Sequence, residues 1–359
     1  MPTQVDALAE FNQPHLDRVS RSFAHGIRQL SPSLRAPVGL SYLICRLLDT
    51  VEDASWGEGE FRDQAQAQAF AAFDSFVERE PKETEVRDWA SRFPLDLTEG
   101  ERILLEDAPR VFRELHALPP EDRKVIAGPV LSMSRGMNHF MSRKRKSGVL
   151  RLSNLGETQS YCFFVAGVVG EVLTGLLKLR SQEAAKRNIS LTQAGRFGLF
   201  LQKVNILKDQ RVDEAQNRFL VPSRQGVLRS AMRDAREAMA YLESIPISET
   251  RYRVFCAWAL LLGLASIPAI EKGYSRDSVG KLPRVEAMWL AHKIEARIGD
   301  EAGLRRLFDD LIAKASAGTS QSPNQVTEAV PTGPLDPELL ALYDGQMGPQ
   351  ELMGLLASV

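Results

Sequence analysis

Apolar residues recur at helical spacing along most of the chain, and the period-two alternation expected of strands is almost absent. The segment 33–51 carries a wide apolar stripe, and the apolar segment 161–179 contains three glycines. Because glycine weakens a helix by about 1 kcal/mol relative to alanine, these glycines indicate close approach of a neighbouring helix or of a ligand. Further helices are predicted at 194–213, 225–244 and 249–272. The pattern therefore predicts an all-α protein.

Breakers separate these helices, and no linker is evident before residue 314. Residues 315–334 are small, polar and proline-bearing, which favours a flexible linker. Residues 335–359 are predicted to form one or two short amphipathic helices. We expect a single helical domain over 1–314, followed by this linker and a tail. The tail would either touch a bilayer or dock onto the fold.

Composition narrows the class of protein. Hydrophobic residues make up 44% and charged residues 25%, as in soluble globular proteins, and the net charge of −1 gives no sign of nucleic-acid binding. The N-terminus lacks the basic start and apolar core of a signal peptide. The longest apolar run, 254–270, is shorter than the ~20 residues of a spanning helix. We expect a cytoplasmic monomer in which 254–270 is a core helix, with peripheral membrane contact as the alternative.

Three carboxylates share one face of the first predicted helix. Asp49, Glu52 and Asp53 stand at i, i+3 and i+4, and the same stripe carries Tyr42 and Arg46. A solvated acidic helix end would explain the acids alone. Clustered carboxylates on a partly buried face are unfavourable without a cation, however, which favours a Mg²⁺ site.

A second polar line lies on the helix predicted at 194–213. Gln202, Asn205, Asp209 and Asp213 follow one another along one face of an otherwise apolar segment. A polar outer face is the plain explanation, but buried polar groups need partners. Two acidic helices make a clamp for a diphosphate and its Mg²⁺ ions plausible, although neither line is specific alone.

Four ordered blocks carry a resemblance to a known family. SRSF at 20–23, YLICRLLDTVED at 42–53, YCFFVAGVVG at 161–170 and GLFLQKVNILKD at 198–209 resemble the signature blocks of squalene and phytoene synthases. They are most similar to those of squalene synthases. The resemblance covers about 15–275 and implies an isoprenoid-synthase helical bundle around a central cavity.

The resemblance also implies roles for individual residues. Its catalytic positions are Tyr42, Arg46 and Tyr161. Its substrate-binding positions are Ser20, Arg21, Ser22, Phe23, Gln202, Asn205, Lys208 and Arg218. Its metal ligands are Asp49, Glu52, Asp53, Asp209 and Asp213.

The implied reaction is the Mg²⁺-dependent head-to-head condensation of two farnesyl diphosphates, through presqualene diphosphate, to squalene, with reduction by NADPH. Lys281 and Arg284 are candidates for contact with a nucleotide phosphate, and the NADPH site is otherwise unassigned. A first alternative is a non-reductive ending that gives dehydrosqualene, phytoene or a hydroxylated product. A second is a degenerate protein that binds prenyl diphosphates without turnover.

The sequence departs from the family pattern at several positions. Val212 stands where the second acidic motif usually has glutamate, and Lys208 replaces an arginine. The residues at 216–217 are Gln and Asn where the family usually has two glycines, and Ala259 replaces a proline. A basic run at 143–146 is either a solvated loop, a phosphate-gathering flap or a contact with an anionic membrane.

Overall fold

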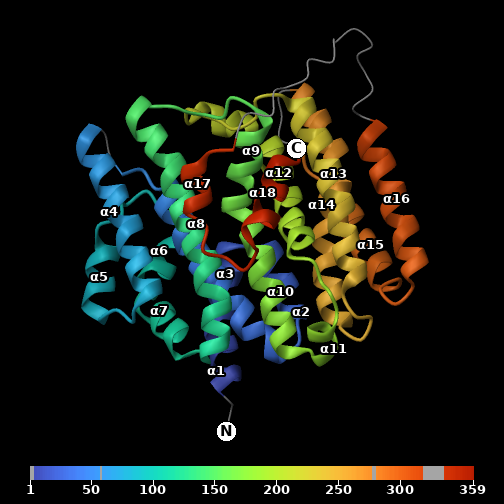
Figure 1. The fold of residues 1–359 in the computed structure, drawn as a ribbon, viewed down its shortest axis with the longest axis horizontal. Helices are drawn as coiled ribbons and strands as arrows, with labels where there is room; N and C mark the ends of the chain where they lie inside the picture. The colour runs from blue at the N-terminus through green and yellow to red at the C-terminus, as the bar shows by residue number, and fades with distance from the viewer. Residues whose placement is uncertain (1–3, 57–58, 277–279, 318–334) are drawn as a thin grey trace.

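The structure, a computed structural model, describes residues 4–56, 59–276, 280–317 and 335–359, with side chains except at 4, 21–22 and 59–62. The described residues form an α-helical bundle, as the sequence predicts (Figure 1). The elements are α1 (Gln4–Val19), α2 (Arg21–Gln29), α3 (Pro32–Asp53), α4 (Gly59–Glu78), α5 (Glu83–Ser91), α6 (Glu99–Glu106), α7 (Ala108–Ala117), α8 (Pro120–Ser147), β1 (Leu150–Arg151), α9 (Leu155–Cys162), η1 (Phe163–Gly167), α10 (Val168–Arg180), α11 (Gln182–Lys186), α12 (Leu191–Ala215), β2 (Arg218–Phe219), α13 (Arg224–Ser244), α14 (Thr250–Ser275), α15 (Arg284–Glu295), α16 (Glu301–Ala317), α17 (Pro337–Ala341) and α18 (Pro349–Ala357).

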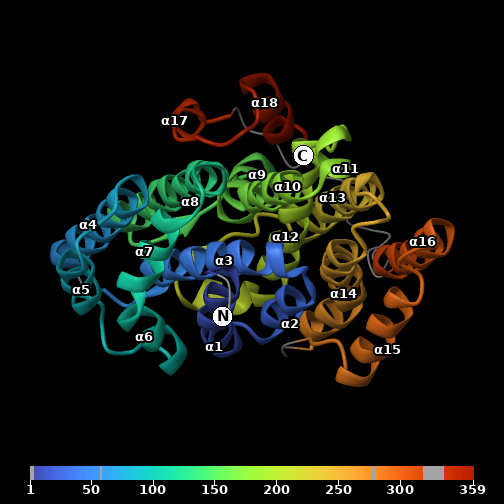
Figure 2. The same cartoon turned by 90° about the horizontal axis from the view of Figure 1, so that it is seen from below.

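The two helices that carry the acidic residues run through the middle of the bundle (Figure 2). α3 packs against α1, α8 and α10, and α12 packs against α10, α13 and α14. Helices α4 to α7 cover one flank, and α15 with α16 covers the opposite flank (Figures 1 and 2). This arrangement places both acidic helices where their neighbours are mostly apolar.

The helix predicted at 161–179 is longer and less regular than its apolar pattern indicates. The helical segment starts at Leu155, and a π-helical turn at Phe163–Gly167 separates α9 from α10. π-helical turns often occur at functional sites because they re-aim the side chains that follow them. Here the turn starts two residues after Tyr161, one of the predicted catalytic residues.

The glycines of this segment permit close helix packing, as predicted. A Cβ atom added to Gly170 would lie 2.1 Å from the carbonyl oxygen of Ala194 on α12. On the opposite side of the same contact, a Cβ on Gly198 would lie 2.3 Å from the carbonyl oxygen of Ala166. Backbone atoms therefore meet directly where α10 and η1 cross α12, and no larger residue fits there.

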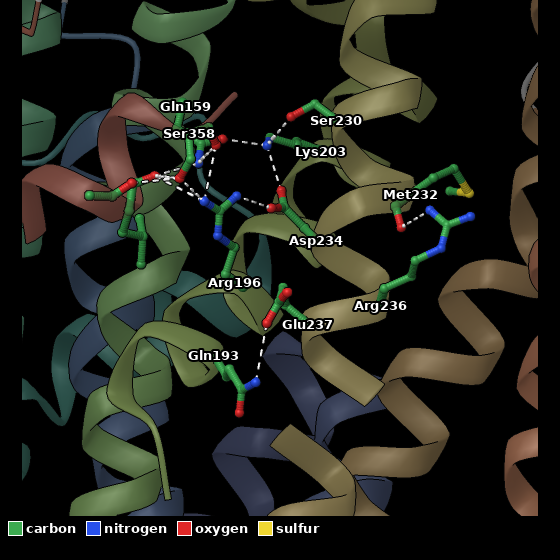
Figure 3. Close-up of polar contacts among 12 residues, drawn as sticks. Gln159, Gln193, Arg196, Lys203, Ser230, Met232, Asp234, Arg236, Glu237 and Ser358 are labelled. Atoms are coloured by element: carbon green, nitrogen blue, oxygen red, sulfur yellow. Dashed lines mark hydrogen bonds and ion pairs between the residues drawn. The ribbon is translucent and has the colours of Figure 1, made fainter. Parts of the chain in front are cut away.

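A buried charge cluster joins α9, α12 and α13 to the C-terminal tail (Figure 3). Asp234, which is fully buried, pairs with Arg196 at 2.6 Å and with Lys203 at 2.5 Å. The Arg196 guanidinium also donates to the carbonyl oxygen of Ser358 at 3.0 Å, and the Gln159 amide donates to that of Leu355 at 3.0 Å. The C-terminal end of α18 thus presents its carbonyl groups to a buried cation, which favours the negative end of a helix dipole.

The tail has a second anchor on α8 and α10. The Glu171 carboxylate is fully buried and accepts hydrogen bonds from the Tyr343 hydroxyl and the Gln346 backbone N–H, both at 2.6 Å. The Asp344 N–H donates to the Ser132 hydroxyl at 2.7 Å. Of the two alternatives for the tail, the structure therefore shows docking onto its own fold. Most of the predicted linker, residues 318–334, lies outside the described residues.

Two helical stretches, 155–180 and α14, are long and apolar enough to cross a membrane by length and composition. The buried shares of their apolar windows are 61% and 56%. In this fold they form inner walls of the bundle, and α14 includes the run 254–270 that was predicted to be a core helix. Their apolar character is explained by packing against α3, α8, α12 and α13.

Candidate active site

The last turn of α3 carries the first acidic group. Glu52 is enclosed, with 5% of its side chain exposed, whereas Asp49 and Asp53 keep 37% and 54%. The three carboxylates share one face, as their spacing requires. Glu52 therefore points into the bundle, while the two aspartates remain accessible to a ligand.

The last turns of α12 carry the second acidic group. Asp213 keeps 17% of its side chain exposed, and Asp209 keeps 41% and lies 3.0 Å from the Lys208 ammonium group. Lys208 also donates to the Asn205 side chain at 2.9 Å. Gln202 lies half-buried farther along the same helix. The predicted polar line therefore ends in two acids and one cation.

Arg218 brings the two acidic helices together. Its guanidinium donates to Asp53 at 2.7 Å and to Glu52 at 3.2 Å, both on α3, and its Nε lies 3.9 Å from a carboxylate oxygen of Asp213 on α12. The Arg218 side chain is only 10% exposed. The same cation therefore faces carboxylates from both acidic helices.

A short strand pair holds Arg218 in this place. β1 and β2 run parallel with Leu150 opposite Arg218, and the Leu150 N–H donates to the Asn217 carbonyl at 2.9 Å. Asn217 has a left-handed backbone with φ of 59°. Asparagine tolerates this conformation better than most residues other than glycine, so it can take the position where glycine is usual.

Tyr161 completes the Arg218 contact. Its hydroxyl accepts from Arg218 at 2.8 Å and lies 3.3 Å from Glu52, to which it donates. The side chain is fully buried, and burial raises the pKa of its hydroxyl well above the ordinary value. Tyr161 is therefore a neutral hydrogen-bonding residue that connects α9 to the acids.

Arg46 has a partner that the sequence did not reveal. Its guanidinium contacts Glu101 of α6 and lies 3.6 Å from Asp49. A Thr98–Glu101 capping box starts α6. This local signal could have located the helix start, but it could not place Glu101 beside α3.

The remaining predicted residues lie at the start of α2 and earlier along α3. The rings of Phe23 and Tyr42 lie 5.5 Å apart, and 41% of Phe23 is exposed. Ser20 is the N-cap residue of α2. Arg21 and Ser22 begin that helix, but their side chains lie outside the described residues.

The acids of the two helices influence one another electrostatically. Burial raises the pKa of Asp49 to about 6, against the attraction of Arg46, and raises that of Asp213 to about 6, against the attraction of Arg218. Burial also raises the pKa of Glu52, which Arg218 opposes. Repulsion from Asp53 adds to all three shifts. Burial is therefore the main cause of these raised pKa values, and repulsion between the acids of the two helices adds to it.

Comparison with known proteins identifies the family. A family model described as squalene/phytoene synthase matches residues 16–225, more than half of the 359-residue chain. The chain belongs to this family. Squalene synthases of Eremothecium gossypii and Bos taurus are 33% and 31% identical over 218 and 208 residues. Each alignment covers 58% of this chain, and it covers 44% and 45% of the two relatives. The chain thus matches less than half of the length of these relatives.

Solved structures share the fold of this squalene/phytoene synthase family member. A complex of TcSQS with the ligand BPH1237 has a TM-score of 0.71 at 21% identity, covering 98% of this chain and 99% of that chain. A dehydrosqualene synthase in complex with ligand has a TM-score of 0.56 at 16% identity, covering 82% and 98%. These likenesses agree with the isoprenoid-synthase bundle that the sequence blocks imply.

The carboxylates of this family member fit magnesium bound together with a diphosphate. Among the described residues, no group of three or more His, Cys, Asp or Glu side chains is placed to hold a metal ion by itself. Mg²⁺ normally takes one or two carboxylates and completes its shell with water and phosphate oxygens. Asp49 and Asp53, whose side chains keep 37% and 54% of their surface exposed, match that requirement.

The departure from the family pattern at Val212 has a structural counterpart. Val212, next to Asp213 on α12, is 52% exposed. Glu214 does not replace the missing acid, because on the helix it is rotated by about 100° from Asp213, and it accepts a hydrogen bond from Gln210 at 2.8 Å. The second acidic group therefore consists of Asp209 and Asp213 alone.

Two cavities lie away from this site. A surface cavity of about 580 Å³ lies between α15 and α16, and its lining includes Lys293, Arg297 and Arg306. A smaller one of about 120 Å³ lies between α4 and α5, near Trp89. Neither has an acid of the two predicted motifs in its lining.

Proposed function

We propose that this protein is a prenyltransferase that condenses two farnesyl diphosphates head to head, through presqualene diphosphate, to squalene. The observation that carries the proposal is the contact of Arg218 with carboxylates of both acidic helices. A pair of acidic helices gathered around one cation suits a diphosphate, which needs both metal ligands and cations. Membership in the squalene/phytoene synthase family supports the same substrate class.

Magnesium would be held by Asp49 and Asp53 of α3 and by Asp209 and Asp213 of α12. When bound, it neutralises the diphosphate leaving group and so assists ionisation of the allylic substrate. Glu52 belongs to the same motif, but its contacts with Arg218 and Tyr161 suit it better to holding that arginine. The two aspartates of α3 are thus the ligands proposed there.

The protein's own cations would orient the diphosphates. Arg218, Lys208 and Arg46 lie beside the acids, and each has donors that suit phosphate oxygens. Ser20, Arg21 and Ser22 at the start of α2 are proposed to add donors at a helix N-terminus. These groups would keep the two C1 atoms in a fixed relation while the diphosphates leave.

We assign different roles to Tyr42 and Tyr161. Tyr42 is half-buried beside Phe23, so its ring can stabilise cationic carbon through its face. Tyr161 is enclosed and its hydroxyl is occupied by Arg218 and Glu52. We therefore propose that Tyr161 is a positioning residue that fixes Arg218. Apolar side chains of α10, α12 and α14 would exclude water from the carbocations.

Incubation of the purified protein with farnesyl diphosphate and Mg²⁺, with and without NADPH, tests the proposal by product mass. Squalene should form only when NADPH is present, and presqualene diphosphate should accumulate without it. Asp53→Asn should lower turnover at least about a hundredfold, since it removes a metal ligand. Asp309→Asn, on an exposed face of α16, is the matched control and should leave turnover unchanged. Equal loss in both variants would remove the assigned role of Asp53.

A non-reductive ending is the second candidate. Ala259 at a position where proline is usual in squalene synthases favours it, and a dehydrosqualene synthase shares the fold. In this case the same incubation would give dehydrosqualene or a hydroxylated product whether or not NADPH is added, whereas phytoene would form only if geranylgeranyl diphosphate replaced farnesyl diphosphate.

A third candidate is a protein that binds prenyl diphosphates without turnover. The absence of an acid at Val212 favours it because the second metal group is reduced to two aspartates. Calorimetric binding of farnesyl diphosphate and Mg²⁺ with no product from any chain length would support this candidate and exclude the other two.

A further inference from the structure

Helix α15 exposes a cluster of large apolar side chains, which we call the α15 patch: Val285, Met288 and Trp289. Their exposed fractions are 79%, 63% and 58%. They stand at i, i+3 and i+4 and therefore share one face of the helix. Leu95, at 98% the most exposed apolar residue described, stands alone by contrast. Single exposed apolar residues are ordinary, whereas a cluster on one helical face indicates a binding surface.

Cations border this patch. Lys281 and Arg284 are exposed at its N-terminal edge, and the Lys293 ammonium group lies 3.4 Å from the centre of the Trp289 ring. Residues 281–297 contain four Lys and Arg against two Glu, while the whole chain has a net charge of −1. An apolar helical face with tryptophan and flanking cations is the composition of helices that lie in the interface of an anionic bilayer.

The N-terminal end of α15 lies near the end of the bundle that carries the acids. Arg211, between Asp209 and Asp213 on α12, donates to the carbonyl oxygen of Tyr274 at the end of α14 at 2.7 Å. Gly280 lies against the carbonyl group of Ala269, on the same part of α14. The chain then enters α15, which forms the edge of the bundle beside α14 and α16 (Figures 1 and 2).

We propose that the α15 patch docks this protein onto an anionic lipid surface, with Met288 and Trp289 inserted among the headgroups. A second copy of the chain fits the patch less well. Three side chains offer on the order of 400 Å², about half of the roughly 800 Å² per partner of a standard protein interface. Docking would bring the acidic end of the bundle toward the phase that holds prenyl lipids. The proposal rests on the surface of α15 and does not require the proposed reaction.

Vesicle flotation of the full chain tests it. The protein should float with phosphatidylcholine vesicles that contain phosphatidylglycerol, float less with phosphatidylcholine alone, and dissociate as salt is raised. The double variant Met288→Ser and Trp289→Ser should weaken binding to the anionic vesicles at least about tenfold, because two apolar anchors are lost. Lys281→Glu with Arg284→Glu should weaken binding to anionic vesicles only.

The matched control is Leu95→Ser, which removes a fully exposed apolar side chain elsewhere and should leave flotation unchanged. Circular dichroism melts of all variants should coincide with the wild type, since every changed side chain is exposed. Failure of the wild type to float, or equal flotation of the serine variant, overturns the proposal. So does concentration-dependent dimerisation in sedimentation equilibrium that the same variant abolishes. Turnover of farnesyl diphosphate in detergent-free solution is measured separately, so loss of flotation and loss of activity are distinguished.

Discussion

At the scale of single residues, Arg218 connects three elements of the candidate site. It contacts Asp53 and Glu52 of α3, Tyr161 of α9 and, at 3.9 Å, Asp213 of α12. Removing one partner of a buried ion pair leaves the others uncompensated and typically costs about 3–5 kcal/mol. We therefore expect Arg218→Gln to lower the free energy of unfolding by about 3 kcal/mol and to abolish turnover.

Urea denaturation and the product assay check this expectation. Arg218→Lys should recover part of the stability but little activity, because an ammonium group cannot serve several carboxylates in a fixed fork. The control is Arg92→Gln, which breaks the exposed pair of Arg92 with Asp88 and should change stability by less than about 1 kcal/mol. Similar effects of the changes at 92 and 218 would contradict a central role for Arg218.

Asp213 provides a prediction about pH. Burial raises its pKa from 3.8 to about 6 in the folded protein. Below about pH 4 the carboxyl group is protonated in both states, and above about pH 6 it is ionised in both. Between these values the folded state binds the extra proton, so the wild type loses stability relative to Asp213→Asn as pH rises. The free energy of unfolding of the wild type should fall by on the order of 2 kcal/mol relative to that of Asp213→Asn between about pH 4 and pH 7.

Urea denaturation of the wild type and of Asp213→Asn, without added metal and at a series of pH values, measures that difference in stability. Val212→Asn places the same amide on the neighbouring, exposed position and should show no such trend. Mg²⁺ with inorganic diphosphate should reverse the trend for the wild type alone, because the metal binds the ionised carboxylate. A constant difference across the pH range would contradict the raised pKa.

The sequence predicted the residues that depend on local spacing. Asp49, Glu52 and Asp53 share a face because i, i+3 and i+4 positions must do so on a helix. The contact between Arg46 and Glu101 spans 55 residues and is set by how α6 packs beside α3. No local pattern contains that information. The assignment of Arg218 came from the family resemblance, since its spacing from the acids has no meaning without the fold.

At the scale of elements, the crossing of α10 and α12 depends on glycine. A methyl group at Gly170 would meet the Ala194 carbonyl at 2.1 Å, and a backbone oxygen cannot move aside as a side chain can. We expect Gly170→Ala to lower the free energy of unfolding by about 1–3 kcal/mol, as overpacking does. Gly354→Ala, with open space around the added methyl group, should be neutral or slightly stabilising. Thermal unfolding of the two variants compares them, and equal melting temperatures would contradict the close contact.

Helical periodicity predicted the elements but not their irregularities. The helices expected at 33–51 and 194–213 correspond to α3 and α12, with ends shifted by a few residues. The π-helical turn at Phe163–Gly167 was missed because it adds only a small phase change to an apolar run. The short pair of β1 and β2, two residues each, was missed because its register is set by tertiary contacts.

At the scale of the whole molecule, the tail covers one face of the bundle and is held there by contacts with two buried charged residues, Glu171 and Arg196. The contacts of Gln159 with Leu355 and of Glu171 with Gln346 join residues 196 and 175 positions apart. Glu171 also has a carboxylate oxygen with no hydrogen-bond partner. The two donors to its other oxygen, the Tyr343 hydroxyl and the Gln346 backbone N–H, both come from the tail, so this buried carboxylate depends on the tail for its hydrogen bonds.

Deletion of residues 335–359 should therefore destabilise the protein by at least about 3 kcal/mol, because Glu171 and Arg196 lose their partners from the tail and the face that the tail covers is uncovered. Glu171→Leu removes the orphaned carboxylate, so it should cost less in the deleted chain than in the full chain. A double-mutant cycle from urea denaturation measures this coupling. Glu183→Leu, whose carboxylate pairs with Arg187 and Ser248 outside the tail, should be additive with the deletion. An unchanged free energy of unfolding after the deletion would mean that the tail covers the bundle without stabilising it. If the effects of Glu171→Leu and the deletion simply add, Arg196 alone anchors the tail.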